Sequence, residues 1–67
     1  MRLKLNGEEE EVAVKNIAEL LEELNAPQTG IAVALNGSVV RRAQHQSTPL
    51  SEGDAVEIIR AVQGGAI

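Results

Sequence analysis

The chain has 67 residues, a net charge of −4, no cysteine and no aromatic residue. A chain of this length forms one small domain, which buries only about 60% of the surface of the unfolded chain. Nine of its apolar residues are alanines, so nearly every Leu, Ile and Val is expected to lie inside. A deep, self-contained active site is therefore not expected. The lack of cysteine excludes disulfides, thiolate nucleophiles and cysteine-ligated zinc.

Membranes and nucleic acids are not expected partners. The longest uninterrupted apolar run, Ile31–Leu35, is too short for the core of a signal peptide or for a membrane span. An acidic chain is a poor match for a phosphate backbone, and without Phe, Tyr or Trp it lacks the rings on which single strands stack. We therefore expect a soluble, cytoplasmic protein.

The N-terminal segment predicts a hairpin. Arg2–Asn6 alternates charged and apolar residues, as a half-buried strand does. Asn6-Gly7 is a strong signal for a type I′ turn, which needs positive φ at both central residues. The return strand is predicted over Glu8–Val14. Its four glutamates, Glu8–Glu11, are interpreted as the solvated part of the hairpin, with an acidic docking patch as the alternative.

A helix is predicted over residues 17–25. Asn16 is a suitable N-cap, and Glu19 three residues later completes a capping-box pattern. An apolar stripe at helical spacing is predicted to face the core: Ile17, Leu20, Leu21 and Leu24. Asn25 and Pro27 are expected to end the helix, because a proline disfavours helical geometry at the residue before it.

Three further strands are predicted. Ile31–Leu35 has a bulky face and an alanine face, and the turn Asn36-Gly37 leads into a short strand at Val39-Val40. Arg41–Glu52 is predicted to be irregular. The last strand is predicted over Ala55–Val62, with Val56 and Ile58 on one face and Glu57, Ile59 and Ala61 on the other.

This order of elements predicts an α+β, β-grasp (ubiquitin-like) fold, in which one helix covers one face of a mixed sheet. The first and last strands are expected to be central and parallel. Residues 1–62 form the predicted domain, and residues 63–67 a flexible C-terminal tail. The helix is expected to cover Leu3, Leu5, Val12, Val14, Val33, Val56 and Ile58. The opposite face then carries an uncovered apolar strip of Ala32, Ala34, Ile59 and Ala61.

Catalytic and metal sites are not expected. His45 is the one histidine, with Ser47, Thr48 and Asp54 nearby in sequence. Proximity in a polar loop does not establish the nucleophile, base and orienting group that catalysis requires, so His45 is interpreted as an exposed loop residue. One histidine and scattered carboxylates have no metal-ligand spacing. No Gly-rich loop joins a strand to a helix, so no nucleotide site is predicted. The chain is predicted not to be an enzyme.

The C-terminal segment indicates a different chemistry. Gly64-Gly65 follows shortly after the last predicted strand. Because glycine has no Cβ, such a peptide can enter a narrow tunnel and approach a nucleotide held by another protein. A terminal carboxylate there could be activated as an acyl-adenylate and then attacked by sulfur or an amine. The alternative is a terminal tail without function.

Several short motifs at fixed spacing together resemble the ThiS family, the sulfur carriers of thiamine biosynthesis. These motifs are Asn6-Gly7, Ile17-Ala-Glu-Leu-Leu21, Val33-Ala-Leu-Asn-Gly37, Val40-Arg-Arg42, Glu52-Gly-Asp54 and Val56-Glu-Ile-Ile-Arg-Ala-Val-Gln-Gly-Gly65. The resemblance covers essentially the whole chain. Its most specific part is the Gly-Asp turn, the strand and the Ala-Val-Gln-Gly-Gly ending.

The resemblance implies a ubiquitin-like carrier whose Gly65 is adenylated and converted to a thiocarboxylate. A ThiF-type adenylating enzyme would use ATP, so the chain itself needs no cofactor. A cysteine desulfurase or a related donor would supply the sulfur, and a ThiG-type thiazole synthase would receive it. Gly64 would supply clearance. Because the uncovered strip lies on the strand that leads into the tail, we expect the activating partner to dock on Ile59, Ala61, Val62 and Gln63.

Two features depart from the family pattern. Many relatives carry a tryptophan near the position of His45, and Ala66-Ile67 follow the Gly-Gly pair. We expect a peptidase to remove Ala66-Ile67. The alternatives for these two residues are an atypical carrier activated poorly at Ile67 and a harmless addition to a tail without function. The alternatives are a carrier that delivers sulfur to molybdopterin, tRNA or cysteine synthesis, or a ubiquitin-like interaction module with an inert tail.

Overall fold

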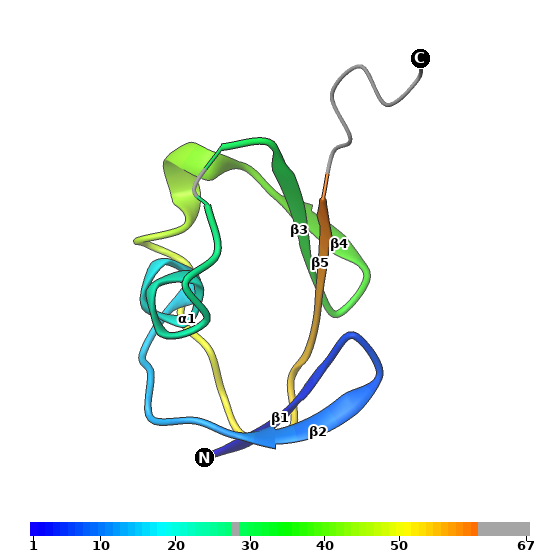
Figure 1. The fold of residues 1–67 in the computed structure, drawn as a ribbon. Coiled ribbons are helices and arrows are strands. Elements are labelled where there is room, and N and C mark those ends of the chain that lie inside the picture. Colours follow the sequence, from blue (N-terminus) through cyan, green and yellow to red (C-terminus); the bar gives the residue numbers. More distant parts are fainter. Residues whose placement is uncertain (28, 61–67) are drawn as a thin grey trace.

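A five-stranded mixed sheet with one helix against it forms the fold (Figure 1). The structure is a computed structural model that describes residues 1–27 and 29–60. The elements are β1 (Arg2–Leu5), β2 (Glu8–Glu11), α1 (Ile17–Glu23), β3 (Ile31–Leu35), β4 (Ser38–Val40), the 3₁₀ helix η1 (Arg42–Gln44) and β5 (Ala55–Arg60). The strand order is β2-β1-β5-β3-β4, with β1 parallel to β5 and the other neighbours antiparallel. The predicted β-grasp fold with central, parallel first and last strands is confirmed.

Both predicted Asn-Gly turns are present. The φ angles are 51° and 86° at Asn6 and Gly7, and 50° and 88° at Asn36 and Gly37. Positive φ at both central residues is the requirement of a type I′ turn, whose twist matches that of the flanking strands. The asparagines therefore occupy a backbone region that most L-residues avoid.

The second strand is shorter than predicted. It ends at Glu11 and not at Val14, because Glu11 pairs with Arg2, the first residue of β1. Val12 makes one further bond, from its amide to the carbonyl of Met1 at 2.8 Å. The chain then leaves the sheet for α1 (Figure 1). All four glutamates of β2 are exposed, as predicted for the solvated part of the hairpin.

The N-terminus of α1 is capped as predicted. The Asn16 side chain accepts a hydrogen bond from the Glu19 amide at 2.8 Å. The Glu19 carboxylate in turn accepts from the amide of Lys15, one residue before the usual capping-box donor, at 2.8 Å. The first of these bonds satisfies a backbone donor that the first turn of a helix leaves unpaired, and the second fixes the residue just before the cap.

The C-terminus of α1 comes earlier than predicted. The helix ends at Glu23, and Asn25 adopts a left-handed φ of 56°. The backbone amide of Asn25 donates to the Glu22 carbonyl at 3.0 Å, and the backbone amide of Ala26 donates to the Leu21 carbonyl at 2.9 Å. These two bonds form a Schellman motif with asparagine in place of the usual glycine. Asn25 therefore ends the helix before Pro27 is reached.

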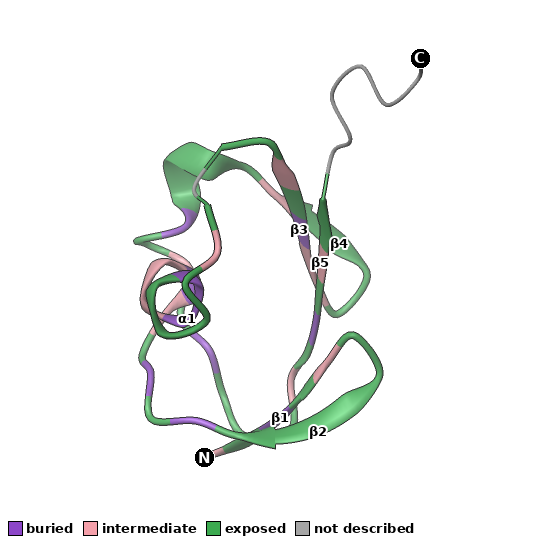
Figure 2. Ribbon diagram, viewed as in Figure 1, coloured by how far each residue is buried: buried purple, intermediate pink, exposed green. Residues whose placement is uncertain are grey.

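The core lies between α1 and one face of the sheet, called here the inner face (Figure 2). Its buried apolar residues are Leu3, Val12, Val14, Ile17, Leu20, Leu21, Val33, Leu50 and Val56. Leu5 and Ile58, also predicted to be covered, are half-buried against this cluster. Leu50 was not among the residues predicted to lie under the helix, because it lies in the loop that precedes β5 and has no periodic pattern around it.

Three aliphatic residues contradict the expectation that nearly all of them lie inside. Leu24 is 39% exposed, so its predicted place in the core is wrong; it is the C-cap of α1, where the chain turns away. Val39 is 76% exposed and Ile59 is 58% exposed. Both lie on the outer face of the sheet, the face opposite α1, by the strand register.

No helix among residues 1–27 and 29–60 is long and apolar enough to cross a membrane.

His45 is buried, so its interpretation as an exposed loop residue is wrong. Only 4% of it is exposed. The 3₁₀ helix η1 turns the loop back onto α1, and the His45 carbonyl accepts from the Ala18 amide at 3.1 Å. The Thr48 hydroxyl donates to the Gln44 carbonyl at 2.6 Å and holds this turn. The ring nitrogen Nδ1 is buried and finds no hydrogen-bond partner among the residues described.

The unpaired Nδ1 predicts the effect of an apolar replacement at His45. A buried polar group without a partner costs about 1–3 kcal/mol. We therefore expect His45→Leu to match or exceed the wild-type free energy of unfolding, measured by urea titration. His45→Ala is the matched control and should lower the free energy by about 2 kcal/mol or more, because it leaves a cavity. Equal losses in both variants would contradict this account of the ring.

Candidate functional site

The outer face of the sheet has an apolar half formed by β5, β3 and β4. The register places Ala32 opposite Ile59 and Ala34 opposite Val39, so these four side chains share one face. We call them the apolar outer patch. Glu57 lies opposite Ala34 within the same face.

Sequence reasoning identified Ile59 and the two alanines but missed Val39. A two-residue turn at Asn36-Gly37 forces Leu35 to pair with Ser38 and Ala34 with Val39. Counting the strand register outward from the predicted Asn36-Gly37 turn would have placed Val39 on the same face as the alanines.

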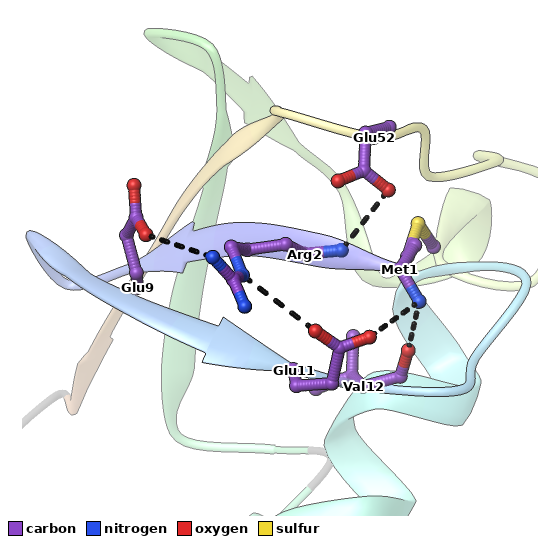
Figure 3. A network of polar contacts seen from close by, with 6 residues as sticks. All are labelled: Met1, Arg2, Glu9, Glu11, Val12 and Glu52. Carbon is purple, nitrogen blue, oxygen red and sulfur yellow. Dashed lines mark hydrogen bonds and ion pairs between the residues drawn. The ribbon is translucent and has the colours of Figure 1, made fainter.

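The other half of the outer face, on β1 and β2, is charged (Figure 3). Arg2 approaches Glu9 at 3.8 Å and Glu11 at 3.6 Å, and its amide donates to the Glu52 carboxylate at 3.1 Å. The Met1 ammonium lies 3.3 Å from Glu11 and donates to the Val12 carbonyl at 2.8 Å. Exposed pairs of this kind add little stability.

The register and the ion pairs show how the charges of the four glutamates, Glu8–Glu11, are distributed over β2. Alternation along β2 places Glu9 and Glu11 on the outer face, with Arg2, and places Glu8 and Glu10 on the opposite side. The run is therefore divided between two faces, and one of these halves is paired with positive charge. It does not form a single acidic surface.

β5 is held on one side by the side chain of a turn residue. The backbone amide of Asn6 donates to the Val56 carbonyl at 2.9 Å. The side-chain carboxamide oxygen of Asn6 accepts from the backbone amide of Ile58 at 2.8 Å. The strand pairing of β1 with β5 has only two register pairs, Lys4 with Ala55 and Leu5 with Val56. Asn6 thus extends this short ladder beyond the end of β1.

Asn36 has the corresponding role on the β3 side. The backbone amide of Asn36 donates to the Ala55 carbonyl at 2.7 Å, and its side-chain carboxamide oxygen accepts from the backbone amide of Ala55 at 2.9 Å. Its carboxamide nitrogen donates to Asp54 at 3.2 Å, and the other Asp54 oxygen accepts from the Ser51 amide at 2.8 Å. We call the Asn6 and Asn36 side chains the asparagine clasps. Together they fix the strand that leads to Gly64-Gly65.

Comparison with known proteins shows which family this chain resembles in sequence. The ThiS family matches residues 3–65. The sulfur carrier protein ThiS of Thermus thermophilus is 38% identical over 61 residues, which cover 91% of this chain and 95% of that protein. The sulfur carrier protein ThiS of Escherichia coli is 34% identical over 53 residues, covering 79% of this chain and 80% of that protein. The chain belongs to the ThiS family.

The fold agrees with that of a solved ThiS family protein. The crystal structure of the thiamine biosynthesis protein ThiS from Geobacter metallireducens superposes with a TM-score of 0.83 at 36% identity, covering 97% of this chain and all of that one. Its solution structure gives a TM-score of 0.79. These findings confirm the family that the motifs indicated. The ThiS family match ends at Gly65, so Ala66-Ile67 lie beyond the matched range.

Within this ThiS fold, the predicted site residues fall into two groups. Ile59 lies exposed on β5, in the apolar outer patch. The others lie outside the described residues: Ala61, Val62, Gln63, Gly64, Gly65, Ala66 and Ile67.

The structure does not bring the polar residues near His45 into a catalytic arrangement. Asp54 is engaged with Ser51 and Asn36, and Thr48 with Gln44, while His45 is buried. In the part of the chain that is described, no three metal-ligating side chains gather to hold an ion.

Proposed function

We propose that this chain carries sulfur as a thiocarboxylate on Gly65 and donates it for the thiazole ring of thiamine. The observation that supports this most directly is the family match over residues 3–65, which ends at the glycine where the chemistry would occur. Two relatives that match most of the chain are named sulfur carrier protein ThiS. The proposal concerns a C-terminal segment that lies outside the described residues, so its support comes from sequence and family.

The proposed chemistry needs one carboxylate from this chain and catalytic groups from its partners. The Gly65 carboxylate attacks the α-phosphate of ATP on a ThiF-type enzyme, which forms an acyl-adenylate and releases pyrophosphate. The outer sulfur of a persulfide on a donor such as a cysteine desulfurase then displaces AMP and forms an acyl disulfide. A thiol reduces this acyl disulfide to the thiocarboxylate and is itself oxidised to a disulfide, and a ThiG-type thiazole synthase consumes the thiocarboxylate. The chain is therefore a protein substrate and not an enzyme, and it needs no cofactor of its own.

The two glycines suit this route. Gly64 has no side chain, so the peptide can pass through a narrow opening toward the nucleotide. The β-branched side chain of Ile67 would crowd that space, because branching at Cβ adds bulk next to the backbone. For this reason Ala66-Ile67 are proposed to be removed by a peptidase before Gly65 is activated.

Docking of the activating enzyme is proposed to involve Ile59, with Ala61, Val62 and Gln63 on the segment that follows. Ile59 is 58% exposed and lies on the strand that leads to Gly64-Gly65, on the face that α1 leaves uncovered. Exposed apolar groups that cluster on a small domain mark partner sites. Glu57, between the apolar residues, is available to a basic group of the partner.

The carrier proposal predicts the behaviour of three chain lengths. A chain that ends at Gly65, incubated with a ThiF-type enzyme, ATP and a sulfur donor, should release pyrophosphate and gain the mass of an oxygen-to-sulfur exchange. The 67-residue chain should react poorly, and a chain that ends at Gly64 is the matched control with a terminal glycine at the wrong distance. Efficient thiocarboxylate formation on Ile67 would contradict the trimming step. A chain ending at Gly65 that releases no pyrophosphate would contradict sulfur carriage itself.

The docking proposal predicts a face-specific effect of an introduced charge. Ile59→Asp should raise the KM for adenylation about fivefold or more, because loss of a central apolar contact typically costs more than about 1 kcal/mol. Leu24→Asp is the matched control: it places the same charge at an exposed apolar residue at the end of α1, away from the outer face. Circular dichroism checks that both variants fold. Equal KM values for the two variants would show that the outer face does not dock the enzyme.

A further inference from the structure

We propose that Asn6 is a site of spontaneous deamidation, and that Asn36, in the same Leu-Asn-Gly sequence, is protected by the fold. Leu5-Asn6-Gly7 and Leu35-Asn36-Gly37 are identical tripeptides, and in each the Asn-Gly pair forms the two central positions of a type I′ turn. Local sequence and turn type therefore do not distinguish them. Their hydrogen bonds do. The proposal concerns the folded domain and is independent of sulfur carriage.

The reaction joins the asparagine side chain to the next backbone nitrogen. The Gly7 nitrogen attacks Cγ of Asn6, the Cγ–Nδ2 bond breaks, and the proton lost from the Gly7 nitrogen leaves with the amide group as ammonia. The product is a five-membered succinimide. Water then adds to either ring carbonyl and opens it to aspartate or isoaspartate, with no oxidation or reduction. Glycine favours the first step because it has no Cβ to obstruct its nitrogen.

The surroundings of Asn6 permit this step. Asn6 is exposed, and a Cβ built on Gly7 would meet nothing within 4 Å. The Asn6 side chain makes one hydrogen bond among the described residues, from the Ile58 amide to its carboxamide oxygen. Its leaving nitrogen is not held by any residue in that part of the chain. One side-chain bond must therefore break before Cγ can turn toward the Gly7 nitrogen.

Asn36 must give up more. Its carboxamide oxygen accepts from the Ala55 amide at 2.9 Å, and its leaving nitrogen donates to Asp54 at 3.2 Å. Asp54 is itself fixed by the Ser51 amide. A Cβ built on Gly37, as on Gly7, would meet nothing within 4 Å, so the space beside the glycine does not distinguish the two sites and the difference lies in the asparagine. Both ends of the Asn36 carboxamide are restrained, whereas only one end is restrained in Asn6.

The consequence of modification follows from the same contacts. Isoaspartate routes the main chain through the side chain and lengthens it by one methylene, which a two-residue turn cannot absorb without changing its register. The acceptor for the Ile58 amide is then displaced. Deamidation at Asn6 to isoaspartate is therefore expected to loosen β5 from β1.

The test is site-resolved deamidation of the intact folded chain in mildly alkaline buffer, followed by peptide mapping and isoaspartate detection. Asn6 should deamidate about fivefold faster than Asn36, the factor that corresponds to one additional hydrogen bond of about 1 kcal/mol. In concentrated urea the two sites should react at similar rates, because their tripeptides are identical. Asp54→Ala should raise the Asn36 rate toward that of Asn6.

Several results would overturn the proposal. They are an Asn36 rate equal to or above that of Asn6 in the folded chain, a difference that persists in urea, and an Asn6 that does not react. If Asp54→Ala fails to fold, the comparison of the native chain with the urea-unfolded chain still decides the question. Asn25, which has positive φ but precedes Ala26, is the internal control and should react more slowly than Asn6.

Discussion

The parallel joint between β1 and β5 is the contact on which the rest of the architecture depends. Two register pairs join these strands, and through them the β1–β2 hairpin meets the β5–β3–β4 half of the sheet. Parallel pairing is slightly less stable per residue than antiparallel pairing. The Asn6 side chain compensates in part, because it accepts from the Ile58 amide where β1 has already ended. A turn residue therefore also serves as one more rung of the central ladder.

The second property of the structure is its outer face. One seven-residue helix covers the inner face, and among residues 1–27 and 29–60 no further helix or strand packs on the other. The face is divided by composition. The β1–β2 half is occupied by Arg2 and its carboxylate partners, and the β5–β3–β4 half carries the apolar outer patch. The proposed docking of an activating enzyme uses the apolar half of this face, because its strand β5 precedes the proposed site at Gly64-Gly65 in the sequence.

Local sequence rules predicted the elements that local interactions determine. The two Asn-Gly turns, the Asn16 cap and the alternation in β5 each need only neighbouring residues, and each was found as expected. The predictions that were wrong depend on contacts distant in sequence. His45 is buried because η1 folds back onto α1. The sequence around His45 has no hydrophobic periodicity that would predict this contact.

The remaining differences have similar causes. β2 ends at Glu11 because Glu11 pairs with Arg2, the first residue of β1, a consequence of register rather than of the composition of residues 12–14. The helix ends early because Asn25 takes the left-handed conformation that sequence rules assign first to glycine. Of the candidate site, the sequence supplied Ile59 and the glycine pair. Val39 and the asparagine clasps emerged only when the register and side-chain bonds were known.

Hydrogen exchange at single amides tests the central role of the β1–β5 joint most directly. If Asn6 completes that joint, the Ile58 amide should exchange as slowly as the amides of β3 in the wild-type protein. Asn6→Ala should accelerate exchange at Ile58, whereas Asn6→Asp, which keeps an acceptor oxygen, should preserve much of the protection. Exchange at Ile58 as fast as that of an exposed loop amide in the wild-type chain, or an Ile58 rate unchanged in Asn6→Ala, would contradict the account.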